Sequence, residues 1–158
     1  CLGIAETYNE ALYKAFLGAG IRLPKYKNMI MTVRPEEQED AVPIAKRFEA
    51  LGYRIYATRG TANTLKEHGV KVIRTNKLEQ PAPNLMDLIL GHKIDVVIDI
   101  PSQGVEHQKD GFVIRRNAIE TGVNVLTSLD TAEALVTSLE NTDANRLSLI
   151  DIATIARR

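Results

Sequence analysis

Between residues 29 and 141 the chain alternates short runs rich in β-branched residues with stretches of helical periodicity. The candidate strands are Met29–Arg34, Tyr53–Thr58, Val70–Thr75, Asp95–Ile100 and Val123–Ser128. The candidate helices fall at about 38–51, 61–68, 84–91, 111–121 and 131–141. Strands separated by helices at this spacing form a parallel sheet with helices on both faces. The alternation therefore predicts an α/β fold, with a doubly wound, mainly parallel, five-stranded sheet.

Local signals support this arrangement. The run Val96–Ile98 is apolar at every position, as expected of a central parallel strand that is buried on both faces. Pro43 is expected in the first turn of its helix, because a proline deeper in a helix removes a hydrogen bond. Asp130 and Glu133 have the spacing of a capping box at the start of the last helix.

Glycines follow several of the predicted helices, where a left-handed cap residue is favoured. These glycines are Gly52, Gly69, Gly91 and Gly122.

The two ends of the chain differ from this repeating part. Residues 5–17 have the spacing of an amphipathic helix that ends at Gly18 and Gly20. Residues 21–28 are basic and interrupted by a proline, which is typical of a linker. The stretch 147–152 is compatible with either strand or helix. We therefore expect a leading helix over 1–20, a linker over 21–28 and one domain over 29–158.

The first residue is Cys1 rather than Met, and we expect the chain to be a segment of a longer polypeptide. A single cysteine excludes an internal disulfide and suits a reducing compartment, so a cytoplasmic location is expected. No apolar run approaches the roughly 20 residues that span a membrane.

The charge balance argues against a nucleic-acid partner, because 20 basic and 20 acidic residues cancel. Metal binding is also not expected. The three histidines, His68, His92 and His107, lie in different elements without a neighbouring cysteine.

Ligands of doubly wound sheets bind outside the carboxyl ends of the strands, so the segments after the strands are the candidate site. The turn from Thr58 to Thr61 ends one strand and opens a helix. Its backbone N–H groups, its two hydroxyls and the close approach that Gly60 allows suit a phosphate. The alternative is that Thr61 is only a helix cap and Gly60 only a turn residue.

Other residues follow strands in the same way. Arg34 and Lys77 could neutralise a bound anion, although Lys77 is equally explained as a solvated surface residue. Asp99 and Ser102 follow the fourth strand. Asp99 could be catalytic, could cap its loop or could pair with Arg59 or Lys77, and it would repel a phosphate beside it.

Arg115 and Arg116 lie near the start of a helix, where the helix dipole favours anions rather than cations. We expect them to pair with acidic residues of a neighbouring domain. The alternative is a solvated helix face.

The order of these segments resembles the methylglyoxal-synthase-like domain, and in particular the version at the end of the carbamoyl phosphate synthetase large subunit. The resemblance covers essentially the whole chain. It rests on the leading helix Thr7–Phe16, on Thr32–Arg34, on Ala57–Ala62, on Asn76–Lys77 and on Asp110–Ala118. The leading helix separates this version from free-standing methylglyoxal synthases, which lack it.

The resemblance implies a regulatory module with no cofactor of its own. The parent enzyme would make carbamoyl phosphate from glutamine, bicarbonate and ATP, with Mg²⁺ or Mn²⁺ and K⁺. Its product would serve arginine or pyrimidine synthesis. Its partners would be the rest of the large subunit, a glutaminase small subunit and further copies of itself. The effectors of such modules include UMP, IMP and phosphoribosyl pyrophosphate. By position, Thr58, Gly60, Thr61 and Lys77 match residues that hold the effector.

Two departures weaken this expectation. Regulated relatives often carry Asn-Thr-Thr-Ser-Gly-Arg after the fourth strand, where this chain has Asp99–Gly104. A lysine of such relatives corresponds to Gln38. Each charge-assisted bond that is lost costs about 1.5–3 kcal/mol, or roughly tenfold or more in affinity. We therefore expect nucleotide control to be weakened or lost, as would suit an isoenzyme for arginine synthesis.

Two rival functions remain. A methylglyoxal synthase would need a catalytic carboxylate in a Gly-Asp-Gln-type segment after the third strand. The stretch Lys77–Asn84 has no such segment, and Asp87 lies on the helix beyond it. An assembly module that binds no small molecule is the other rival.

Overall fold

The structure is a computed structural model that describes residues 1–21, 24–77, 80–102 and 105–155, with only the backbone for 105–110, 154 and 155. Two compact units divide the chain. One consists of Arg22–Glu133, and the other combines Cys1–Ile21 with Ala134–Arg158. The predicted domain boundaries stay a prediction.

The larger unit is built on a five-stranded sheet. Its strands are β1 (Asn28–Val33), β2 (Arg54–Ala57), β3 (Val72–Arg74), β4 (Val96–Ile100) and β5 (Asn124–Leu126). Their order is β3-β2-β1-β4-β5, and every neighbouring pair is parallel. All five predicted strands are present, and the α/β fold class is confirmed.

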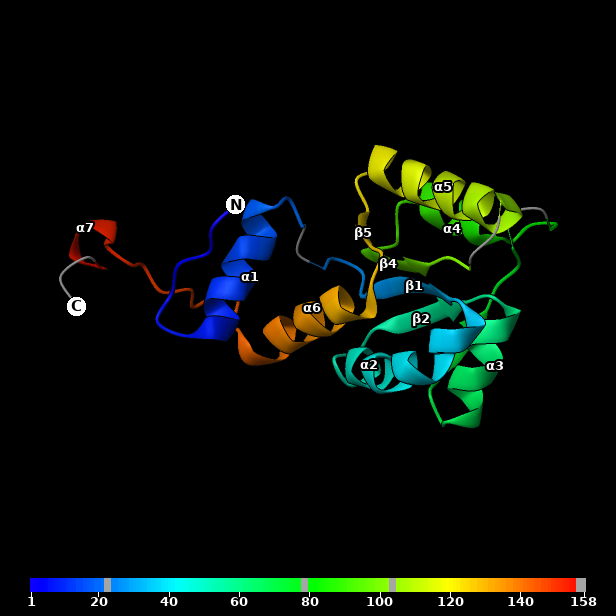
Figure 1. Cartoon of the computed structure of the whole chain (residues 1–158), viewed down its shortest axis with the longest axis horizontal. Coiled ribbons are helices and arrows are strands. Elements are labelled where there is room, and N and C mark those ends of the chain that lie inside the picture. Colours follow the sequence, from blue (N-terminus) through cyan, green and yellow to red (C-terminus); the bar gives the residue numbers. More distant parts are fainter. Residues whose placement is uncertain (22–23, 78–79, 103–104, 156–158) are drawn as a thin grey trace. The chain divides into compact units, whose positions relative to one another are not determined.

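Helices cover both faces of this sheet (Figure 1). After β1 a 3₁₀ turn (Pro35–Glu37) leads into α2 (Gln38–Ala50), which lies on the same face as α3 (Arg59–Glu67). The opposite face carries α4 (Leu85–Leu90) and α5 (Val105–Glu120). The chain winds outward from β1 to β3 and then returns to the other side of β1. The winding direction therefore reverses between β1 and β4.

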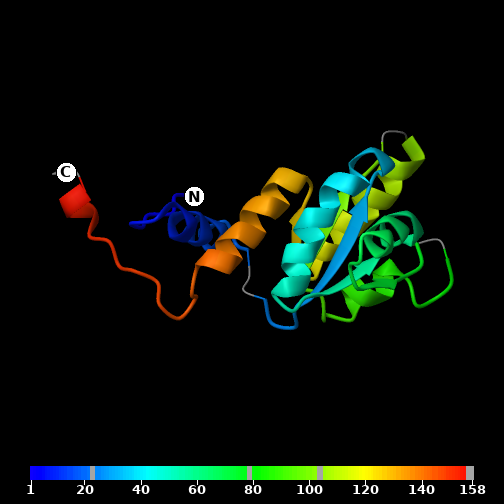
Figure 2. The same cartoon turned by 90° about the horizontal axis from the view of Figure 1, so that it is seen from below.

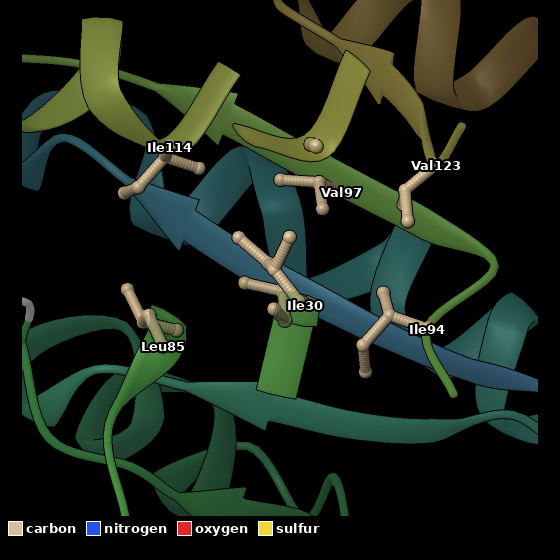
Figure 3. Close-up of a cluster of buried hydrophobic side chains, with 8 residues drawn as sticks. Ile30, Leu85, Ile94, Val97, Ile114 and Val123 are labelled. Atoms are coloured by element: carbon tan, nitrogen blue, oxygen red, sulfur yellow. The ribbon is translucent and has the colours of Figure 1, made fainter. Parts of the chain in front are cut away.

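Apolar side chains fill the space between the sheet and each helical layer. On the α4–α5 face, Ile30 of β1 and Val97 of β4 pack with Leu85 of α4 and Ile114 of α5 (Figure 3). On the other face Phe48 of α2 is fully buried and meets Tyr53 edge-to-face at 5.1 Å between ring centroids. All five residues of β4 are buried, as predicted for a central strand.

Helix α2 differs from its prediction in the place of its proline, and helix α5 differs in its start. Pro43 lies past the first turn of α2, contrary to expectation. The proline takes one hydrogen bond from the helix, and both Pro43 and Glu39, four residues earlier, are exposed. Water can therefore solvate the carbonyl that the missing N–H leaves behind. Helix α5 begins at Val105, six residues before the predicted start.

Two capping predictions were wrong in detail. Ser128, not Asp130, caps α6 (Leu129–Asn141), because its hydroxyl accepts a hydrogen bond from the Thr131 N–H at 3.2 Å. Glu133 pairs with Arg47 at 3.5 Å instead of closing a capping box. After α4 the left-handed residue is His92, at φ 52°, whereas Gly91 keeps a helical φ of −68°. Gly52, Gly69 and Gly122 have the expected positive φ.

The smaller unit holds α1 (Tyr8–Gly18) against the segment that follows α6. The Ser148 hydroxyl and N–H both donate to Glu10, at 2.7 and 2.5 Å. Lys14 donates to the Ser148 carbonyl at 2.6 Å and pairs with Glu10 at 3.1 Å. Residues 147–151 are neither strand nor helix, and α7 (Ile152–Ile155) follows. The hydroxyl, N–H and carbonyl of Ser148 thus tie this segment to α1. In Figure 2 the segment is the orange-to-red part of the chain beyond α6.

This attachment is expected to depend on pH. Hydrogen bonds from Ser148, followed by the interaction with Lys14, hold the pKa of Glu10 below its ordinary 4.5. A lowered pKa means that the carboxylate stabilises the attachment above pH 4.5 and loses that effect as pH falls through the lowered pKa. The protection of the Ser148 amide against hydrogen exchange, relative to an unstructured peptide at the same pH, should therefore fall as pH drops through this lowered pKa. In Ser148→Ala the Glu10 pKa, followed by NMR titration, should move back toward 4.5. A wild-type Glu10 that titrates at 4.5 would contradict this account.

Candidate anion-binding site

A pocket of about 290 Å³ lies at the carboxyl ends of β1 and β4, where the winding direction reverses. Doubly wound sheets bind ligands at this point. All seven predicted effector-binding residues line it: Arg34, Thr58, Gly60, Thr61, Lys77, Asp99 and Ser102. The structure therefore brings together residues that the sequence distributes over four strand ends.

The first turn of α3 presents unused donors to the pocket. Thr58 is its N-cap residue, but the Thr58 side chain makes no capping hydrogen bond. The first N–H groups of a helix have no intrahelical partner, and the dipole places positive potential there. The Thr58 hydroxyl and this turn can therefore both serve an anion.

The Thr61 hydroxyl, which was expected to serve a bound phosphate, is bonded to the backbone of β1. It is buried, with 2% exposure, and its hydroxyl donates to the Val33 carbonyl at 3.3 Å while accepting from the Val33 N–H at 3.1 Å. Its one proton is thus committed to β1. Thr61 lines the pocket and fixes α3 to the sheet, and Thr58 supplies the free hydroxyl of this turn.

Gly60 is favoured by a close approach to Gln38 rather than by its backbone angle. A Cβ at this position would lie 3.1 Å from Nε2 of Gln38. That amide donates to the Val33 carbonyl at 3.0 Å, and its oxygen accepts from the Thr64 hydroxyl at 2.8 Å. Gln38 therefore lines the pocket and joins α2, α3 and β1.

Two cations lie at the mouth of the pocket. Arg34 follows β1, pairs with Glu37 and has an Nε atom that is buried without a hydrogen-bond partner in the described part of the chain. Lys77 is exposed, and within the described ranges no ion pair involves it. Both side chains can therefore approach a bound anion.

The Asp99 carboxylate accepts hydrogen bonds from a neutral hydroxyl and from a positively charged guanidinium. It lies beside Thr32 in the register of β1 and β4, and the Thr32 hydroxyl donates to it at 2.7 Å. On its other oxygen, Nη1 of Arg115 donates at 2.7 Å. The Asp99 side chain is 4% exposed. Pairing with Arg59 or Lys77 was one of the alternatives for Asp99, and the ion pair in the structure is with Arg115, which offsets the negative charge in the pocket.

The two adjacent arginines of α5 lie in different surroundings. Arg115 bonds Asp99, whereas Arg116 pairs with Glu120 on its own helix at 2.8 Å and keeps 64% of its side chain exposed. The pairing of Arg115 within its own unit was not apparent from the sequence. The interdomain contact expected of both residues stays a prediction.

Other candidate sites have less support. A second hollow shares Arg34 but is lined by Glu37, Asp40, Asp130 and Glu133, which disfavour an anion. Within the described residues, no three His, Cys, Asp or Glu side chains are grouped to hold a metal ion. In the same part of the chain, no helix has the length and apolar character needed to cross a membrane. Gln103 and Gly104, part of the predicted loop after β4, lie outside the described residues.

Comparison with known proteins identifies the family. Residues 40–127, more than half of the chain, match the family model of the MGS-like domain, and the chain belongs to this family. It is similar to proteins named carbamoyl phosphate synthase large chain. It is 62% identical over 155 residues to that of Lachnoclostridium phytofermentans and 61% identical over 156 residues to that of Agathobacter rectalis. Each match covers 98% of this chain and 14% of the relative.

A more distant large chain, from Clostridium botulinum, is 43% identical over 136 residues, which are 85% of this chain and 13% of the relative. The chain therefore spans a small part of the length of these curated relatives. Among solved structures, the crystal structure of ForH has a TM-score of 0.53 with 17% identity, over 73% of this chain and 80% of that one. This likeness shows the fold alone.

The ion pair between Arg115 and Asp99 depends on Gly111, which is one turn earlier on α5. A Cβ there would lie 2.7 Å from Nη1 of Arg115 and 3.1 Å from Oδ2 of Asp99. Gly111→Ala should push the guanidinium away and lower the free energy of unfolding by about 1–3 kcal/mol, although alanine favours helices by roughly 1 kcal/mol. Urea denaturation measures this. In an Arg115→Ala background the same substitution should cost less, because only the contact with Asp99 and Pro101 remains, and an equal loss in both backgrounds would contradict the mechanism.

Proposed function

We propose that this chain is the regulatory domain of a carbamoyl phosphate synthase large chain and that its pocket binds an effector through a phosphate group. The convergence of the seven predicted residues on one pocket carries this proposal. The similarity to large chains over 98% of this sequence supports the parent enzyme.

A phosphate fits this pocket for three reasons. The turn after β2 supplies backbone N–H groups and the Thr58 hydroxyl. Arg34 and Lys77 supply positive charge at the mouth. The lining is otherwise largely apolar, with Leu85 and Ile114 among its residues, and so can hold the base or sugar of a nucleotide.

The strength of binding depends on the residues after β4. The stretch Asp99–Ser102 offers one hydroxyl and no cation. Pairing with Arg115 reduces the repulsion by Asp99 without adding a net positive charge. Effector control that is weaker than in relatives with Asn-Thr-Thr-Ser-Gly-Arg is therefore part of the proposal, and UMP, IMP and phosphoribosyl pyrophosphate are the effectors to test.

The activity of the parent enzyme follows from the relatives. It would be an ATP-dependent ligase, with Mg²⁺ or Mn²⁺ and K⁺, that works with a glutaminase small subunit in the cytoplasm. Regulation requires that the effector bind two states of that enzyme with different affinity. Carbamoyl phosphate made in this way would feed arginine or pyrimidine synthesis.

A lyase activity of the methylglyoxal synthase type is disfavoured by the acidic residues near the pocket. Asp87 accepts a hydrogen bond from the Asn84 N–H at 2.9 Å and so completes the capping box of α4. Asp99 is engaged by Thr32 and Arg115. Incubation with dihydroxyacetone phosphate should therefore release no methylglyoxal above the uncatalysed rate. Release that Asp99→Asn abolishes would replace the regulatory proposal with the lyase.

Thermal unfolding with and without millimolar UMP, IMP, phosphoribosyl pyrophosphate or ornithine tests the effector site. A ligand at one hundred times its dissociation constant adds about 2.7 kcal/mol of stability, which raises Tm by several degrees in a domain of this size. We expect such a shift with at least one phosphate-bearing ligand, and its loss in Lys77→Gln. No shift with any of them, together with concentration-dependent association, would favour the assembly module.

A further inference from the structure

The guanidinium of Arg115 lies next to two residues that line the pocket, Asp99 and Gly111. Its Nη1 is 2.7 Å from Oδ2 of Asp99, which lines the pocket. The same Nη1 lies 2.7 Å from where a Cβ of Gly111, another lining residue, would be. The absence of a side chain at Gly111 thus opens the space through which Arg115 reaches the carboxylate.

Helix geometry places Arg115 on the pocket side of α5. Gly111 lines the pocket, and Arg115 follows it by four residues, the spacing that keeps two residues on one helix face. Arg116, one position later, bonds Glu120 on the exposed surface of the same helix. The adjacent arginines therefore provide a test residue and a matched control.

Arg115 has donors left for a ligand. A guanidinium carries five N–H groups in a planar fork, and among the residues that the structure describes the bond to Asp99 uses one of them. Its side chain is 28% exposed, so the fork is not enclosed by protein. Asp99 is itself fixed by Thr32, and this bond limits the positions that the guanidinium can take. A fork oriented in this way is suited to phosphate.

We propose that Arg115 is an anion-binding residue of this pocket, held in position by Asp99, and that its free N–H groups contact the phosphate of the ligand. This inference rests on the proposed function of the pocket. Asp99, which would repel a phosphate if it were alone, becomes a positioning residue for a cation. The stretch Asp99–Ser102 has no cation of its own, and the Asp99–Arg115 pair supplies one beside it.

Isothermal titration with UMP and with inorganic phosphate, at one fixed salt concentration, tests this role in four proteins. They are the wild type, Arg115→Gln, Arg116→Gln and the double variant Asp99→Asn/Arg115→Gln. The double variant removes one acid and one cation, so its net charge equals that of the wild type. It also leaves no unpaired carboxylate in a buried position, which protects its folding. Circular dichroism and thermal unfolding confirm that each variant is folded.

We expect Arg115→Gln to weaken binding by about tenfold to a hundredfold, the effect of losing a charge-assisted hydrogen bond. Arg116→Gln should bind within about twofold of the wild type, since an exposed pair contributes little. The double variant decides the role. It should stay about tenfold weaker if Arg115 contacts the ligand, and wild-type affinity in it would show that Arg115 only neutralises Asp99 and would overturn the inference.

Failure of the proposed function and failure of the proposed role of Arg115 give different results. A wild-type chain that binds neither probe, and whose Tm is also unchanged by IMP and phosphoribosyl pyrophosphate, would overturn the proposed function and this inference with it. A wild type that binds a probe, alongside an Arg115→Gln variant of equal affinity, would overturn the role of Arg115 and leave the effector site intact.

Discussion

The site depends on one constraint, the parallel pairing of β1 with β4 at the point where the sheet changes its direction of winding. Helices α2 and α3 cover one face and α4 and α5 the other, so beyond the ends of β1 and β4 no crossover fills the space. The same pairing sets Thr32 beside Asp99, with both side chains on the face that α5 covers. The pocket and its internal ion pair are thus consequences of one register.

The charge of the pocket is then set by how Asp99 is compensated. A carboxylate on a side chain that is 4% exposed is costly unless it is paired and hydrogen-bonded, and here it has both kinds of partner. The pairing requires α5 to approach the strand end closely, which the missing side chain of Gly111 permits. One glycine on a helix thereby influences the electrostatics of a site formed by other elements.

Much of this could be predicted from the sequence, because strand and helix periodicity and the rule for ligand sites in doubly wound sheets are local or general. The alternation of elements predicted all five strands, and their ends predicted the residues that line the pocket. The partners of those residues could not be predicted, since they come from other elements. The hydroxyl of Thr61 is taken by Val33, and Asp99 by an arginine on α5. The sequence also did not indicate that His92, and not Gly91, adopts the left-handed conformation after α4.

The bonds of Thr61 and Gln38 to Val33 have a consequence for the thermodynamics of recognition. They join the first turn of α3, the start of α2 and the end of β1 into one hydrogen-bonded unit before any ligand arrives. A binding wall that is already rigid loses little conformational entropy when it is occupied. The unfavourable part of the binding free energy should therefore come mainly from desolvation of the ligand. The enthalpy of binding should then reflect the contacts between ligand and wall, with little contribution from the ordering of a loop.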